Sequence, residues 1–291
     1  MDYHRQFRQA AIAQGIPADE IDTFAGFLRF AIWTRTHGEG TPVGQRGGLP
    51  RLPAGTAWPL SEDGEPLPFV ASFDCAALPR VDDLPLPTDG TLLFFLHHED
   101  AHETYDVTAE QGHARVLHVP AGVETVTAEV PEYSDMTFSN MELEFVTRAY
   151  DLYASVTADL PDWLDESGPE QHLGRHLTHL PQLRALAGKL WPENGTPEVM
   201  LGGHSMHIGE LATDAIHTTP ETRIADERLS AAAPDGWAAG LEEETLRVMS
   251  EWVPLAQFVP EDVYIGRFLI RRDDLAAGRY DRAMSYTAFT E

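Results

Sequence analysis

Residues 69–74, which read FVASFD, and residues 90–96, which read GTLLFFL, decide the fold class of this chain. Both segments are rich in aromatic and aliphatic residues and are bounded by turn formers, a composition that predicts strands. A similar pair lies near the C-terminus, where residues 253–258 read VPLAQF and residues 265–270 read IGRFLI. This echo predicts an internal duplication of a small sheet unit, although short apolar strands also resemble one another by chance.

A double glycine precedes each of these segment pairs, Gly47-Gly48 in the first half and Gly202-Gly203 in the second. Further strands are predicted by the same composition and turn boundaries. In chain order the predicted strands are residues 69–73, 91–97, 114–119, 124–130, 141–147, 251–259, 263–271 and 282–289. Strands grouped toward both ends, with helix between them, predict an α+β protein with two similar, mostly antiparallel sheet units.

Helices are predicted at the N-terminus and in the middle of the chain. The apolar residues Ile21, Phe24 and Leu28 recur at steps of three and four, which predicts an N-terminal helix that ends before Gly38. A leucine stripe predicts a helical insertion around residues 169–190. We therefore divide the chain into an N-terminal helical segment (1–40), a first sheet unit (41–160), and the helical insertion with the second sheet unit (161–291), in one compact domain.

The charge of the chain excludes several partners. Twenty Lys and Arg against 47 Asp and Glu give a formal net charge of -27. Nucleic acids and anionic membranes need a cationic surface, so neither is expected as a partner. The single cysteine, Cys75, cannot form an intramolecular disulfide, which is typical of a cytoplasmic protein. The longest apolar run, residues 92–96, is far shorter than the roughly 20 residues that a membrane-spanning helix needs.

Histidines at helical spacing form the first candidate metal site. His172 and His176 are four residues apart in the predicted insertion, so a helix places both on one face, where they can share a zinc ion. His179 lies about 10.5 Å along the helix axis from His172, too far to join both in one site. A polar helix face beside the leucine stripe produces the same pattern, so that alternative stays open.

A second candidate metal site follows the apolar run that ends at Leu96. His98, Asp100 and His102 lie on one side of the chain if it stays extended there. Imidazole and carboxylate together make a mixed ligand set suited to a metal ion. The solvated end of a strand has the same composition, which is the alternative interpretation.

Trp58 and Trp252 lie near equivalent points of the predicted repeat. Together with Gln257 they are candidates to line a binding cleft between the two halves. Large aromatic residues also serve as core anchors, which is the competing interpretation. No catalytic residue is predicted, because the sequence around Ser205 lacks the second glycine of a nucleophile elbow and Cys75 has no basic neighbour.

A specific signature occupies the N-terminal half of the chain. Residues 40–44 read GTPVG, residues 47–53 read GGLPRLP, residues 58–59 read WP, and residues 90–95 read GTLLFF. In this order and spacing the chain resembles the YwqG-like family of bacterial proteins, a domain of unknown function, from about residue 40 onward. The resemblance implies an α+β fold with an internal duplication. It also implies a role by analogy, since some relatives are suspected immunity partners of secreted toxins.

Two functions are consistent with these observations. The first is a non-enzymatic, acidic interaction module of the immunity or inhibitor type, which presents its negative charge to a basic protein partner. The alternative is a small-molecule binding protein or a metal-dependent enzyme with a pocket between the two repeats. The sequence leaves the oligomeric state open.

Overall fold

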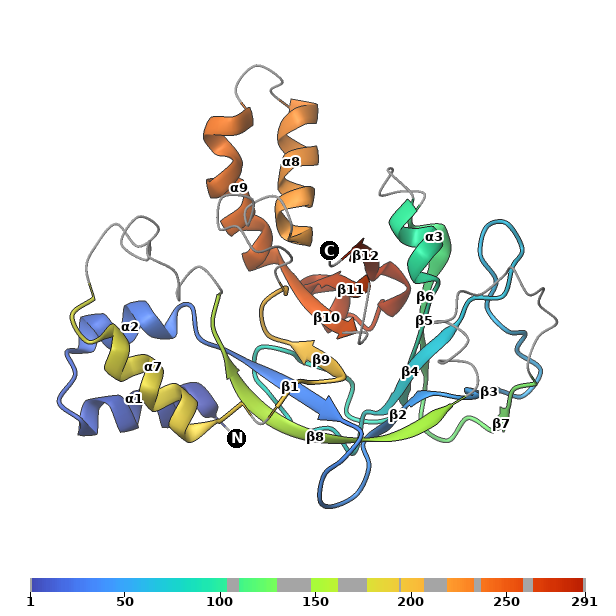
Figure 1. Ribbon diagram of the computed structural model, residues 1–291, viewed down its shortest axis with the longest axis horizontal. Coiled ribbons are helices and arrows are strands. Elements are labelled where there is room, and N and C mark those ends of the chain that lie inside the picture. Colours follow the sequence, from blue (N-terminus) through green and yellow to red (C-terminus); the bar gives the residue numbers. More distant parts are fainter. Residues whose placement is uncertain are drawn as a thin grey trace.

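The computed structural model describes residues 2–103, 110–129, 148–161, 177–193, 195–206, 219–232, 237–258 and 264–289. Ten strands form one sheet in the order β12-β11-β10-β9-β1-β8-β2-β4-β5-β6, and every neighbouring pair is antiparallel (Figure 1). Their bounds are β1 (Arg29–Arg35), β2 (Gly44–Gly47), β4 (Phe69–Asp74), β5 (Thr91–Leu96), β6 (Ala114–Val119), β8 (Ala149–Asp159), β9 (Val199–Gly202), β10 (Trp252–Phe258), β11 (Tyr264–Arg271) and β12 (Met284–Phe289). Two further strands, β3 (Arg51–Pro53) and β7 (Thr125–Thr127), pair separately. The α+β expectation is confirmed, but the strands form one continuous sheet instead of two separate units.

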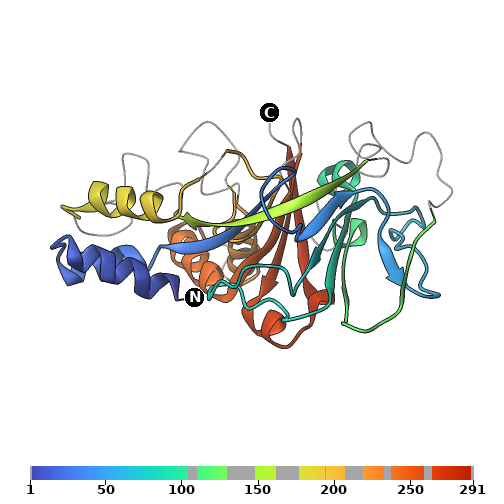
Figure 2. The ribbon, with the colours of Figure 1, turned by 90° about the horizontal axis from the view of Figure 1, so that it is seen from below.

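The strands on either side of the central β1–β8 pair form two wings, β9-β10-β11-β12 and β2-β4-β5-β6. The sheet curls until these two wings face each other, so that it is nearly closed into a barrel (Figure 2). The ring of Phe94 on β5 lies 5.5 Å from that of Phe258 on β10 and 5.3 Å from that of Phe268 on β11. All three side chains are buried. Their contact places the main hydrophobic core inside the curl, where apolar residues from both wings are removed from water.

Side chains bridge the gap between the two ends of the sheet. The side-chain amide of Gln111 accepts a hydrogen bond from the Ser285 backbone N–H (2.7 Å) and donates one to the Ser285 carbonyl (3.0 Å). The Glu110 carboxylate accepts from the Thr287 backbone N–H (2.6 Å). These two residues therefore satisfy backbone groups on the edge of β12 that a neighbouring strand would otherwise pair.

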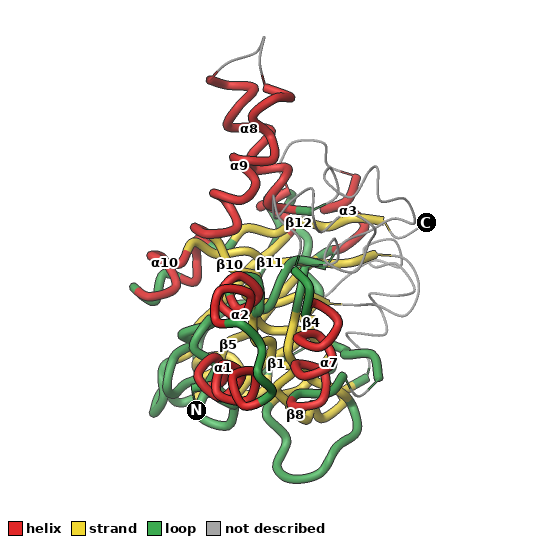
Figure 3. The backbone as a smooth tube through the Cα atoms, turned by 90° about the vertical axis from the view of Figure 1, so that its left-hand side faces the viewer, coloured by secondary structure: helices red, strands yellow, loops and turns green. Residues whose placement is uncertain are grey.

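Helices lie at one end of the central β1–β8 pair and against the β10-β11-β12 side of the sheet (Figure 1, Figure 3). The helices α1 (Tyr3–Ala13), α2 (Ala18–Ala25) and α7 (Leu180–Leu190) group at one end of the β1–β8 pair, and α8 (Pro220–Ala232) with α9 (Trp237–Glu251) forms a hairpin against β10. The short helices α3 (His98–Glu103) and α10 (Arg272–Ala276) follow β5 and β11. None of the helices in the described ranges is long and apolar enough to cross a bilayer.

The strand predictions at 69–73, 91–97, 114–119, 251–259, 263–271 and 282–289 are confirmed, with ends that differ by at most two residues. The prediction at 124–130 shortens to β7, and residues 141–147 lie outside the described part. The N-terminal helix prediction is wrong beyond Ala25, because residues 29–35 form the central strand β1. Of the predicted insertion, the described part is helical only from Leu180, one residue before Pro181. The division of the chain at residues 40 and 160 stays a prediction.

The Asp83 carboxylate ties the N-terminal helix to the sheet. It lies 3.1 Å from the Nε2 atom of His4 and accepts the backbone N–H of Phe30 at 3.1 Å. The hydrogen bond to Asp83 raises the pKa of His4. Burial alone would raise the pKa of Asp83, but the bonds from His4 and Phe30 hold it below its usual value.

We expect His4→Ala to destabilise the protein by about 0.5–1 kcal/mol, and only within a limited pH range. The His4 contribution is complete below about pH 6.5 and disappears as the pH rises through the raised pKa of His4. The Asp83 contribution is complete above about pH 4 and disappears as the pH falls through its lowered pKa. Urea unfolding of wild type and variant should therefore differ most near pH 5–6. His37→Ala, at an exposed loop histidine, is the control, and an equal loss at pH 5.5 and 9 would contradict the assignment.

Candidate functional site

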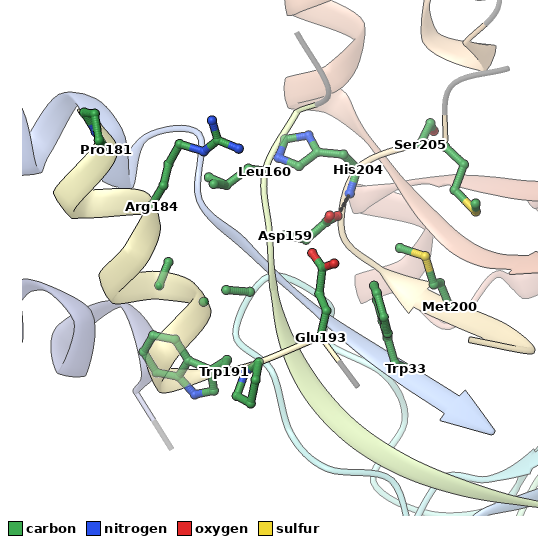
Figure 4. A pocket seen from close by; sticks show the side chains of 15 residues that line it. Trp33, Asp159, Leu160, Pro181, Arg184, Trp191, Glu193, Met200, His204 and Ser205 are labelled. Atoms are coloured by element: carbon green, nitrogen blue, oxygen red, sulfur yellow. Dashed lines mark hydrogen bonds between the residues drawn. The ribbon is translucent and has the colours of Figure 1, made fainter. Parts of the chain in front are cut away.

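A pocket of about 940 Å³ lies between α7 and the outer face of strands β1, β8 and β9 (Figure 4). Large apolar and sulfur-containing side chains make part of its wall: Trp33, Leu160, Trp191, Met200 and Met206. Polar side chains make the rest: Asp159, Arg184, Glu193, His204 and Ser205. Apolar surface combined with a few fixed polar groups is typical of small-molecule sites.

The turn after β9 carries three of the lining residues. Gly202 and Gly203 both have positive φ values, 76° and 77°, which reverse the chain at the end of the strand. The His204 backbone N–H donates to Oδ2 of Asp159 at 2.5 Å. An added Cβ on Gly203 would meet that same oxygen at 2.2 Å, so only glycine fits between the turn and Asp159.

Gln257 on β10 holds this turn from behind. Its side-chain oxygen accepts the backbone N–H of Met206 (2.7 Å), and its amide nitrogen donates to the carbonyl of His204 (2.9 Å). Arg267 on β11 adds a hydrogen bond to the carbonyl of Met206 (3.1 Å). Both side chains are buried, so the positions of His204, Ser205 and Met206 are fixed without help from solvent.

The side chains of His204 and Ser205 form hydrogen bonds with other groups and not with each other. The His204 Nε2 atom lies 2.8 Å from the Phe27 carbonyl and so carries its proton. Burial lowers the pKa of His204 to about 3, which keeps the ring neutral. The Ser205 hydroxyl donates to Glu221 at 2.8 Å, and burial raises the pKa of that carboxyl. His204 is therefore not placed to activate Ser205 as a nucleophile.

An ion pair between Arg223 on α8 and the buried Glu110 holds α8 in place. The same helix carries Glu221, which bonds Ser205 in the pocket wall. The Arg223 guanidinium donates to Glu110 at 3.1 Å, and Glu110 is fully buried. Burial raises the pKa of Glu110 to about 7, although its bonds to Thr287 and Arg223 favour the charged form. These bonds join α8, β12 and the segment before β6, so they fix the hairpin that carries Glu221.

The two predicted cleft tryptophans lie in separate hydrophobic clusters. Trp58 packs edge-on against Phe95 at 5.8 Å and donates to the Leu67 carbonyl at 2.8 Å. Trp252 is buried beneath α8 and α9, with the Arg271 guanidinium 6.0 Å from its ring. The pocket of Figure 4 is lined by neither tryptophan, and their role in a cleft stays a prediction.

The metal-site predictions meet different outcomes. His172 and His176 lie outside the described residues. The expected extended run at residues 98–102 is wrong, because these residues begin the helix α3. Successive residues of a helix turn by about 100°, so Asp100 does not share the helix face of His98. The Asp100 carboxylate instead lies 3.5 Å from His97. As a metal-ligand set, His98, Asp100 and His102 stay a prediction. The described residues hold no cluster of three or more His, Cys, Asp or Glu suited to a metal, and zinc stays a prediction.

Most residues of the pocket were not predicted from the sequence. Trp33, Asp159 and His204 are far apart in the chain, and only the pairing of β1 with β8 and β9 brings them together. Gln257 was predicted as a cleft residue, and it contacts the turn that lines the pocket. The available signal was Gly202-Gly203, since two consecutive glycines followed by His and Ser indicate a tight turn that presents polar groups.

The fold and the pocket define an α+β protein in which a curled antiparallel sheet carries a polar and aromatic pocket at its centre. The chain belongs to the family described as a domain of unknown function, DUF1963, whose family model matches residues 45–288. A search of curated proteins finds no match to the chain.

Proposed function

We propose that this protein binds a small molecule in the pocket between α7 and the central strands. The observation that carries the proposal is the fixed turn at residues 203–206, which holds polar groups opposite the apolar side chains of Trp33 and Trp191. A preformed site of this kind binds without the entropic cost of ordering its own loops. The neutral His204 ring and the Ser205 hydroxyl supply orientation, and the aromatic rings supply buried area.

We also infer an internal duplication of the chain, and it supports a site at this position. On either side of the central β1–β8 pair the strand order runs β9-β10-β11-β12 and β2-β4-β5-β6, and β2 and β9 both end in a double glycine with positive φ. Each wing contains a hairpin with a register shift, β4–β5 and β10–β11, followed by a short helix. In this arrangement β1 is the first strand of one repeat and β9 is the second strand of the other. The pocket lies where these two strands pair. The resemblance to the YwqG-like family, with its implied duplication, covers nearly the same residues as the family match.

Gly188 offers a direct way to fill the pocket. It lines the pocket from α7, and an added Cβ there would meet no atom within 4 Å. We expect Gly188→Phe to fold with unchanged or higher stability, because glycine in a helix interior is less favourable than phenylalanine by a few tenths of a kcal/mol. The same variant should weaken binding of small aromatic probes (neutral indole, anionic benzoate and cationic tyramine) by about tenfold, as measured by titration calorimetry.

Gly188→Ala is the matched control. It removes the same glycine but leaves room for a ligand, so it should bind the probes as wild type does and unfold at a higher temperature. Binding of none of the three probes at millimolar concentration, or equal binding by wild type and Gly188→Phe, would refute the proposed site.

A second function rests on charge. We infer that the chain, with a formal net charge of -27, also suits a basic protein partner in the cytoplasm, as an immunity or inhibitor module would. Its test is a calorimetric titration against a basic protein that copurifies with the full chain, at low and high salt. Affinity should fall steeply as salt rises, because screening shortens the range of the attraction to about 8 Å at physiological ionic strength. Salt-independent binding would exclude a charge-driven role.

A further inference from the structure

We propose that Arg35 and Trp33 form an anion-binding corner of this pocket, so that its ligand carries a carboxylate or phosphate group. The inference rests on the proposed small-molecule function and specifies the class of ligand. It concerns the Trp33 end of the pocket, on the outer face of β1. Trp33 lines the pocket, whereas Arg35 lies beside the Trp33 ring and outside the set of lining residues.

The two side chains leave the same face of β1, because residues two apart in a strand point in the same direction. The guanidinium carbon of Arg35 lies 5.7 Å from the centre of the Trp33 ring. Only 8% of Trp33 and 9% of Arg35 is exposed. Three hydrogen-bond donors, the indole Nε1 and the Nε and Nη2 atoms of Arg35, are buried here without an acceptor in the described part of the chain. The remaining guanidinium nitrogen makes one long bond to Ser155, at 3.4 Å.

Other arginines of this acidic chain pair with carboxylates. Arg46 bonds Glu198 at 2.7 Å, Arg223 bonds Glu110 at 3.1 Å, and Arg279 bonds Asp274 at 2.7 Å. For Arg35 no carboxylate within ion-pair distance occurs among the described residues, even though the chain has 47 Asp and Glu. A guanidinium does not lose its proton in proteins, so a buried one without an acceptor is costly. An anion supplied from outside the chain removes that cost.

The chemistry of the donors selects the ligand. The Nε and Nη2 atoms of arginine form a planar fork that matches the two oxygens of a carboxylate or phosphate. An indole N–H adds one more donor and cannot accept. With an anionic group at this corner, the rest of the molecule lies toward Met200 and Trp191 in the pocket. The geometry therefore favours a small aromatic or apolar acid over a neutral or cationic molecule of the same size.

Nuclear magnetic resonance on the full-length protein tests this assignment at the two residues. Benzoate and phenyl phosphate represent the two anions, indole is the neutral probe, and sodium chloride matches the ionic strength. We expect both anions to shift the indole N–H signal of Trp33 and the Nε–H signal of Arg35 together and to saturation, and the tighter of the two identifies the preferred headgroup. The Trp33 signal is assigned by its loss in Trp33→Phe. If these donors bond only to water, neither anion will shift the Trp33 or Arg35 signal, and the proposal is wrong.

Variants at Arg35 separate this inference from the function on which it rests. Arg35→Met should weaken benzoate binding by about tenfold or more and leave indole binding within about twofold, because a charge-assisted bond is lost. Arg35→Lys keeps the charge but not the planar fork, so its benzoate affinity should lie between those of wild type and Arg35→Met. It replaces Arg35→Met in the test if that variant does not fold. Arg51→Met, at an arginine on β3 that bonds Thr125 and Thr127, is the matched control. If indole binds and Gly188→Phe blocks it while benzoate gains nothing from Arg35, only the anion corner is refuted. If no probe binds, both proposals fail.

Discussion

Replacing Phe94 with alanine should lower the free energy of unfolding by about 3–5 kcal/mol, the range for a fully buried phenylalanine. Phe94 has no exposed surface, and its ring contacts Phe73, Phe258 and Phe268 at centroid distances of 6.0, 5.5 and 5.3 Å. It therefore joins the β4–β5 wing to the β10–β11 wing across the interior of the curled sheet. Urea unfolding followed by circular dichroism measures the loss.

A double-mutant cycle shows whether Phe94 couples the two wings or only fills volume. Phe94→Leu and Phe268→Leu should be non-additive by about 0.5–1.5 kcal/mol, because their rings contact each other. Phe95 is the matched control, since it follows Phe94 in the chain but faces the opposite side, against Phe69 and Trp58. The Phe95→Leu and Phe268→Leu pair should be additive. Additive effects for Phe94 and Phe268 would mean that the wings are stabilised independently.

The hairpin strands could be predicted from the sequence, whereas the central strands could not. β4, β5, β10 and β11 are short, apolar and bounded by turns, so composition alone identifies them. β1 lies between β8 and β9, and its residues are nearly all buried, so it lacks the alternation of a half-exposed strand. Leu28 and Ala31 also continue the helical spacing of Ile21 and Phe24, which α2 uses only as far as Ala25. Pairing with β8 and β9 makes this segment a strand, and the helix or strand preference of its own residues does not predict that pairing.

The same reason explains how little of the site could be predicted. Ala31 pairs with Gly202 in β9, and Arg29 pairs with Asp159 in β8, so the pocket wall is assembled from segments more than 100 residues apart. Gln257 was identified because it lies in a repeated strand. The donors of Trp33 and Arg35 had no sequence signal, since their lack of an acceptor is a property of their surroundings.

Gly203→Ala should have the second large effect, a loss of about 3 kcal/mol in unfolding free energy together with weaker binding of the aromatic probes. Two causes add. A residue with a side chain at φ 77° is strained by about 1–2 kcal/mol. The new Cβ would also meet Oδ2 of Asp159 at 2.2 Å and Cβ of Ala31 at 3.1 Å, which forces the turn away from β8. Movement of the turn breaks the bond from the His204 N–H to Asp159 and displaces the pocket wall.

Gly15→Ala separates the two causes, because Gly15 has nearly the same φ (76°) and an added Cβ there meets nothing within 4 Å. It should therefore cost only the backbone strain, about 1–2 kcal/mol, and leave probe binding unchanged. In an Asp159→Ala background the clashing oxygen is absent, so Gly203→Ala should then cost little more than Gly15→Ala. If the two glycine variants are equally destabilising in the wild-type background, the contact between the turn and Asp159 does not shape the pocket. A difference that disappears with Asp159→Ala would show that this single carboxylate sets the position of the turn, and with it the position of His204 and Ser205 in the wall.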